Sequence, residues 1–203
     1  MPARPGTDAA RGSIGHDGGM EQASDVRHLW ILRHAKAVPE AVGGGPDRDR
    51  RLTGRGRRDA TALGRRLADE RPPLGLVGLV APELALCSSA IRTVETADLV
   101  LGAREERVPL DVYSTLYQST PETVLTFLRE VDEHARSVLV VGHNPTMYLL
   151  AWDLLAEGSA DRDTLEVGGF PTCGLAVLEL QAGSWEDVAP GSATLRGLFT
   201  PPY

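Results

Sequence analysis

The sequence contains little cysteine, no long apolar run and no excess of positive charge. Its two cysteines, Cys87 and Cys173, lie far apart and match no CxxC spacing, which favours reduced structural thiols over a disulfide and fits a cytoplasmic protein. No apolar stretch approaches the roughly 20 residues of a membrane-spanning helix, and the N-terminus lacks the apolar segment of a signal peptide. A formal net charge of −7 disfavours binding to nucleic acid or to anionic lipid. Any anion that binds must therefore meet positive charge that is local.

One folded domain is predicted for residues 26–203, because 203 residues with 42% apolar content can form one sizeable core. Residues 1–25 are rich in glycine, alanine and charge and lack an apolar period, so we expect a disordered tail. The rest alternates buried-type strands with helical patterns, which predicts an α/β fold, a three-layer sandwich with a mainly parallel central sheet. The expected strands are residues 26–32, 76–81 with a short continuation at 84–87, 108–113, 137–141 and 173–180.

Cationic side chains follow three of these strands. Arg33 and His34 come directly after the first strand, His143 follows Gly142 at the end of another, and Arg92 lies in the first turn of a helix. Ligands of such sheets bind outside the carboxyl ends of the strands. We therefore expect two imidazoles and two guanidiniums to meet in one pocket.

Phosphate is the ligand that this set of side chains favours. Two buried guanidiniums need an anion between them, and their planar forks match a tetrahedral oxyanion. A neutral histidine beside the phosphate can attack phosphorus and form a covalent intermediate. Arg33, Arg92 and a protonated His143 can stabilise the transferring group, so the chemistry requires neither a metal nor another cofactor.

At these positions the sequence resembles the histidine phosphatase superfamily, the phosphoglycerate-mutase-like group. More narrowly it is similar to the bacterial phosphohistidine phosphatases. Alanine replaces the glycine of the superfamily's Arg-His-Gly motif, and Arg51 replaces a proline of the second motif. The similar segments are "LRHAK" (residues 32–36), "DRRLTGRG" (49–56), "SSAIRTVETA" (88–97) and "VGHNP" (141–145).

The resemblance implies a role for each site residue. His34 would be the nucleophile that becomes phosphorylated, while Arg33, Arg92 and His143 would hold the phosphoryl oxygens. Asn144 would either orient His143 or cap the following helix. The implied partner is a phosphorylated protein or a small phosphorylated molecule, and no oligomeric state is indicated.

One departure from the family pattern bears on the substrate. Many phosphomonoesterases of the superfamily place an acid where this sequence has Gln118, and Glu122 is better explained as a helix-capping residue. The imidazole of phosphohistidine leaves more readily than an alkoxide, which favours phosphohistidine as substrate. Two alternatives stay open: a phosphatase of small monoesters or nucleotides, with an acid supplied by Asp47 or Asp49, and a phosphate-binding module without turnover.

Other polar residues have simpler interpretations. Six arginines between residues 48 and 58 favour a solvated helix face over a nucleic-acid patch, or else a rim that attracts an acidic substrate. His28 and His134 are assigned to structure. Cys87 lies five residues before Arg92, but the intervening segment lacks the glycine of a phosphate-binding thiol loop, so a Cys87 nucleophile is the less favoured alternative.

Overall fold

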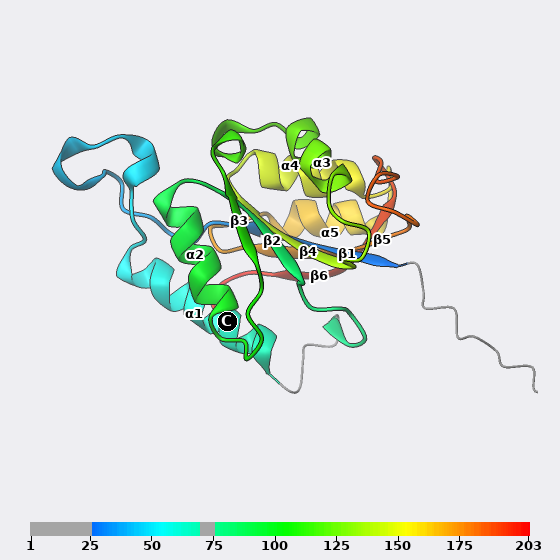
Figure 1. The fold of residues 1–203 in the computed structure, drawn as a ribbon, viewed down its shortest axis with the longest axis horizontal. Coiled ribbons are helices and arrows are strands. Elements are labelled where there is room, and N and C mark those ends of the chain that lie inside the picture. The colour runs from blue at the N-terminus through cyan, green and yellow to red at the C-terminus, as the bar shows by residue number, and fades with distance from the viewer. Residues whose placement is uncertain (1–25, 70–75) are drawn as a thin grey trace, which may run out of the picture.

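A computed structural model describes residues 26–69 and 76–203, so the predicted disordered tail lies outside the described residues. A six-stranded sheet with strand order β3-β2-β4-β1-β5-β6 forms its centre (Figure 1). Of these six strands, β5 alone runs antiparallel to its neighbours. The strands are β1 (Arg27–Arg33), β2 (Leu84–Ser88), β3 (Leu110–Tyr113), β4 (Ser137–Gly142), β5 (Leu175–Leu180) and β6 (Ala193–Phe199).

Helices cover both faces of the sheet (Figure 1). Helices α1 (Gly54–Ala68) and α2 (Ile91–Leu101) lie on one face, and α3 (Pro121–Arg129), α4 (Thr146–Leu154) and α5 (Ala160–Gly168) lie on the other. Alternate residues of β1 enter the two cores, Leu29 and Ile31 one and Trp30 and Leu32 the other. The predicted α/β fold with a mainly parallel central sheet is confirmed. None of the described helices combines the length and apolar character needed to cross a membrane.

The start of α1 is held against the chain that leaves β1. The Thr53 hydroxyl caps the helix by accepting a hydrogen bond from the Gly56 amide, and it also donates one to the Lys36 carbonyl. A Cβ atom on Gly56 would lie 2.2 Å from that same carbonyl oxygen. Glycine at this position therefore lets the helix approach the loop that follows the first strand.

The strand predicted for residues 76–81 is wrong. Gly78 has φ of +79°, which favours a turn. The backbone of Val80 is paired with side chains, because its N–H donates to Nδ1 of His28 and its carbonyl accepts from the Ser137 hydroxyl. Side chains thus bond to the Val80 backbone in place of a neighbouring strand, and the strand begins only at Leu84.

Helix α5 and strand β6 were not anticipated, since each has a weak sequence pattern. Among its nine residues α5 fully buries only Leu165. Strand β6 forms an edge of the sheet and is mostly half-buried, so its apolar residues do not alternate clearly. Contact between the two elements fixes them, with the Leu195 amide donating to the Asp161 carboxylate.

Candidate active site

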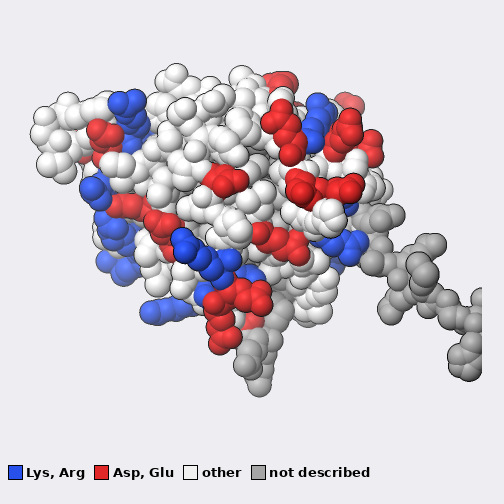
Figure 2. Space-filling model, in the orientation of Figure 1, with Lys and Arg blue, Asp and Glu red and all other residues white. Residues whose placement is uncertain are grey.

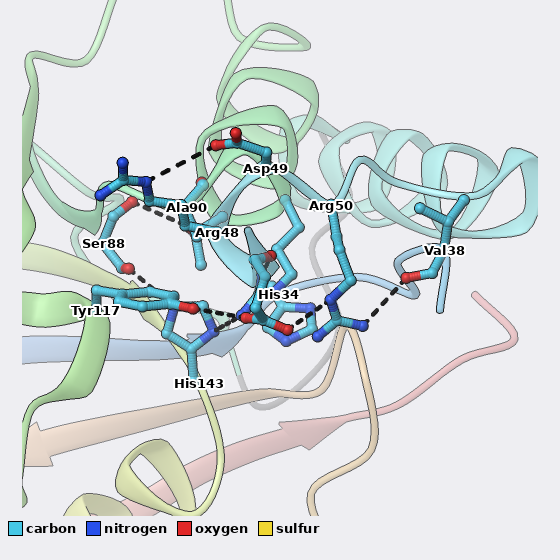
Figure 3. Close-up of polar contacts among 12 residues, drawn as sticks. His34, Val38, Arg48, Asp49, Arg50, Ser88, Ala90, Tyr117 and His143 are labelled. Atoms are coloured by element: carbon cyan, nitrogen blue, oxygen red, sulfur yellow. Dashed lines mark hydrogen bonds and ion pairs between the residues drawn. The ribbon is translucent and has the colours of Figure 1, made fainter. Parts of the chain in front are cut away.

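Three adjacent parallel strands, β1, β2 and β4, end at the same edge of the sheet, and this edge carries the predicted site. Arg33, His34, Arg92 and His143 line one cavity of about 480 Å³ there. Figure 3 shows the imidazoles of His34 and His143 side by side, and their ring centres lie 5.1 Å apart. A larger hollow of about 660 Å³ at the far end of α2 is lined by none of these residues.

The hydrogen bonding of His34 defines which ring nitrogen is free. Its Nδ1 lies 2.8 Å from the Ala35 carbonyl oxygen, which can only accept, so Nδ1 carries the hydrogen. The lone pair is therefore on Nε2. Burial lowers the pKa of His34 to about 4, and the charges of Arg92 and Arg33 act in the same direction. His34 is neutral at neutral pH, as a nucleophile must be.

His143 is held by a serine and an arginine. Its Nδ1 faces a guanidinium N–H of Arg92 at 3.4 Å and must accept, so Nε2 carries the hydrogen and donates to Oγ of Ser88 at 2.8 Å. Burial lowers the pKa of His143 to about 3, with further lowering by His34 and Arg92. The protonated His143 expected from the sequence is thus not the form that these surroundings favour.

The arginines of the site retain unused hydrogen-bond donors. Arg33 donates from Nη1 to the Phe170 carbonyl at 2.9 Å, and both Nη atoms of Arg92 contact Asp47. The Nε atoms of Arg33 and Arg92 are buried, and no described residue pairs with them. Burial also lowers the pKa of Arg33. Buried donors of this kind suit an anionic ligand.

Asn144 lies beside Arg33. Its side-chain amide donates to the Phe170 carbonyl at 3.0 Å, which is the carbonyl that also accepts from Arg33. Pro145, not Asn144, occupies the N-cap position of α4, and no side-chain capping bond is present there. The capping alternative for Asn144 is therefore wrong. Its position by Arg33 is compatible with a phosphate-binding role.

Two loop aspartates behave differently. Asp47 lines the cavity, and its Oδ2 lies 2.9 Å from Nη2 of Arg92 and 2.6 Å from the Tyr117 hydroxyl. Asp49 instead points toward Arg48, at 3.9 Å, away from the imidazoles (Figure 3). The hydrogen bond from Tyr117 is the main cause that lowers the pKa of Asp47 to about 2.

Several residues of the site were not singled out from the sequence, among them Arg50 and Tyr117, which line the cavity, and Ser88, which is buried and bonded to His143. Ser88 is the first serine of the "SSAIR" motif, and that motif was the available signal. Arg50 was predicted only as one of six arginines on a solvated helix face or on a rim that attracts an acidic substrate. Tyr117 carried no signal beyond its place next to Gln118. Gln118, at the position where many phosphomonoesterases of the superfamily place an acid, does line the cavity.

Thr96 of the "SSAIRTVETA" motif joins α2 to the chain that follows β1. The Ala35 amide donates to Oγ1 of Thr96 at 3.0 Å, and this hydroxyl donates to the Arg92 carbonyl at 2.6 Å. Glu95 next to it accepts from the Leu52 amide at 2.8 Å. These bonds fix Arg92 relative to the end of β1.

The structure does not support a thiol nucleophile at Cys87. Both cysteines are free and buried, and burial raises the pKa of Cys87 to about 12, so a thiolate nucleophile is not available at neutral pH.

Around α1 the arginines are exposed and paired with acids, Arg51 and Arg57 each lying 3.1 Å from Glu95. On the face in Figure 2 basic side chains gather mainly on the left, among acidic ones. A solvated, paired surface describes Arg51 and Arg57, whereas Arg50 lines the cavity as a residue of the active-site rim would.

No three histidine, cysteine, aspartate or glutamate side chains within residues 26–69 and 76–203 come together as a metal site would require. His28 and His134 lie outside the cavity. His28 is buried, with Nε2 3.9 Å from the Glu179 carboxylate, and His134 pairs with Asp132 at the surface. Both have the structural surroundings that were expected.

Comparisons with known proteins identify the family of this chain. The family model for the histidine phosphatase superfamily (branch 1) matches residues 29–119. An uncharacterised protein of Mycobacterium tuberculosis is 36% identical over 173 residues, or 84% of this chain and 99% of the relative.

Two solved structures are similar along most of the chain. A proposed phosphohistidine phosphatase, SixA, from Nakamurella multipartitia is 31% identical, with a TM-score of 0.71 over 88% of this chain and 98% of that one. A second proposed SixA, from Agrobacterium tumefaciens, is 30% identical, with a TM-score of 0.68 over 86% and 98%.

Proposed function

Because this chain belongs to the histidine phosphatase superfamily, we propose that it is a phosphohistidine phosphatase that works through a phosphorylated His34 and needs no metal. The likeness to the two proposed SixA phosphatases supports this substrate class. The similarity to these two structures extends over 88% and 86% of this chain.

The observation that carries the substrate proposal is the lack of a proton donor. Among the residues that line the cavity, the one carboxylate is Asp47, and its low pKa keeps it ionised. Gln118 cannot donate a carboxylic proton. An alkoxide leaving group would need such a donor, whereas an imidazole leaves as a neutral ring after taking a proton from solvent. A P–N bond is therefore the bond best suited to this pocket.

The reaction has two steps. In the first, the Nε2 lone pair of His34 attacks phosphorus, a new N–P bond forms, and the bond between phosphorus and the substrate imidazole breaks. In the second, water attacks phosphorus, the N–P bond to His34 breaks, inorganic phosphate leaves, and the proton lost by water passes to solvent. Arg33 and Arg92 stabilise the equatorial oxygens throughout.

His143 and Asn144 complete the binding of the phosphoryl group. As the pocket stands, His143 is neutral, and its Nε2 hydrogen is directed to Ser88. A doubly charged phosphoryl group beside His143 opposes the effect of burial and raises its pKa, which allows it to act as a second donor. Asn144 donates to the same Phe170 carbonyl as Arg33, which places its side-chain amide beside that guanidinium, and we assign it to the phosphate-binding set.

The monoester alternative is favoured by one observation, the position of Asp47 in the cavity. A substrate that neutralised its partners could let this carboxyl take up a proton and serve as an acid. The alternative predicts comparable turnover of phosphate esters and phosphohistidine. The ratio of ester turnover to phosphohistidine turnover therefore distinguishes this alternative from the proposal.

The test is release of inorganic phosphate, with EDTA present, from a phosphohistidine-containing protein and from a panel of phosphomonoesters. His34→Ala is the test variant, and His134→Ala, at an exposed histidine outside the cavity, is the matched control. We expect rapid release from phosphohistidine, slow release from esters, loss of activity in His34→Ala and full activity in His134→Ala. Fast ester turnover would support the monoester alternative, and no turnover by wild type would support a binding module.

A further inference from the structure

The loop between β1 and α1 places a negative charge at the position where a phosphoryl group should bind. Asp47 lies on the short 3-10 turn Asp47–Asp49, and its backbone carbonyl accepts from Nη1 of Arg92 at 2.8 Å. Its Oδ2 accepts from Nη2 of Arg92 at 2.9 Å and from the Tyr117 hydroxyl at 2.6 Å. Its Oδ1 lies 2.7 Å from Nε of Arg50, an ion pair without hydrogen-bond alignment.

These contacts use the groups that the proposed reaction needs. The side chain of Arg92 is 5% exposed, so few other partners can reach it. Asp47 occupies both of its terminal nitrogens. An end-on fork from Arg92 to a phosphoryl group, with one N–H from each terminal nitrogen, requires those same N–H groups, and the unpaired Nε remains as a further donor. Substrate and Asp47 therefore cannot both hold Arg92 in this way.

The loop that carries Asp47 contacts the body of the domain through this cluster and is closed at its base. Its side chain is 52% exposed, and Val42 at the loop tip is 90% exposed. In Figure 1 the loop projects from the body of the domain beside α1 and α2. Outside the Asp47 cluster, the Val38 amide donates to the Arg51 carbonyl and the Val38 carbonyl accepts from Nη1 of Arg50 at 3.1 Å, next to a bridge between Ala37 and Leu52. Losing the Asp47 contacts thus disturbs little of the packed core.

We propose that Asp47 is a specificity-determining residue that acts as an internal competitor for the phosphate site: its carboxylate holds Arg92 until a doubly charged phosphoryl group displaces it. The inference rests on the proposed function, in which Arg92 binds the phosphoryl oxygens. A singly charged anion gains no more from Arg92 and Arg50 than Asp47 already does. The exchange therefore favours phosphoryl dianions, and the returning carboxylate helps to expel product phosphate.

A competitor differs from a proton donor in what its removal does. Asp47→Asn removes the negative charge but keeps the shape, so the competitor role predicts tighter binding of phosphate. Loss of a general acid would leave phosphate binding unchanged and slow the turnover of esters. A purely structural role for Asp47 would weaken phosphate binding, because the arginines would lose a partner that orients them.

The experiment measures the Kd of inorganic phosphate by calorimetry, which requires no turnover and so is independent of the phosphohistidine substrate. Asp49→Asn is the matched control, since it removes the same charge two residues away. The Asp49 side chain is 48% exposed and lies 3.9 Å from Nε of Arg48. We expect Asp47→Asn to bind phosphate roughly tenfold more tightly than wild type, as expected for removing a like charge a few ångströms from a dianion. Asp49→Asn should match wild type.

Tyr117→Phe provides a second variant. It removes the hydrogen bond that holds the Asp47 carboxylate, so it should tighten phosphate binding by a smaller factor in the wild-type background and have no effect in the Asp47→Asn background. Unchanged or weaker binding in Asp47→Asn would overturn the proposal, as would equal tightening in Asp49→Asn. Absence of phosphate binding in wild type and both variants would overturn it together with the phosphate site.

Discussion

Replacing Ser88 with alanine tests whether the position of His143 matters for phosphoryl transfer. The Ser88 hydroxyl is fully buried and lies 2.8 Å from Nε2 of His143. Alanine leaves that buried N–H without a partner, which costs about 1–3 kcal/mol. If the cost falls on the transition state, kcat/KM decreases by about 5- to 150-fold, since each 1.36 kcal/mol corresponds to a factor of ten.

The assay is kcat/KM for phosphate release from a phosphohistidine-containing protein, with a urea unfolding curve for each variant. Ser89→Ala is the matched control, because the neighbouring serine is half-buried and contacts neither imidazole. It should retain wild-type kcat/KM. A Ser88→Ala enzyme within about twofold of wild type would refute the positioning role, because a lost buried hydrogen bond should cost more than that.

Three further predictions concern charge and packing. In an NMR titration the imidazole of His34 should stay neutral down to about pH 4, because burial lowers its pKa, whereas exposed His134 should titrate above 6.5; a midpoint near 6.5 for His34 would contradict this. Arg92→Lys should lower kcat/KM by about 100-fold or more, since an ammonium cannot replace the fork, and a loss below about threefold would count against its role. Gly56→Ala should destabilise the fold by about 1–3 kcal/mol through a 2.2 Å clash with backbone, as urea unfolding would measure, while Gly54→Ala, whose nearest neighbour is a flexible side chain at 3.6 Å, should be neutral or stabilising.

The sequence was sufficient for the part of the site that regular structure positions. Arg33 ends a buried strand, and His34 and His143 each directly follow one. The carboxyl ends of parallel neighbours must share one edge of the sheet. Arg92 could be placed because its helix begins right after such a strand. The weak elements, α5 and β6, escaped prediction because their contacts to the rest of the fold, and not their own periodicity, hold them in place.

The remaining polar contacts depend on loop geometry that no spacing predicts. Asp47 and Asp49 are equivalent in sequence, yet a single 3-10 turn directs the first toward Arg92 and the second toward solvent. Tyr117 lies 70 residues away from Asp47, so only the folded chain brings its hydroxyl to that carboxylate. The ionised state of Asp47 follows from this contact and could not have been inferred from composition.

The central claim is that His34 carries the phosphoryl group during turnover. Its most direct test is rapid quenching of wild type and His34→Ala after mixing with a phosphohistidine-containing protein, followed by mass spectrometry of the peptides. The account predicts up to one phosphate per chain, on His34 of the wild type and absent from the variant. Phosphate on another residue, or full turnover without any phosphorylated enzyme, would contradict it.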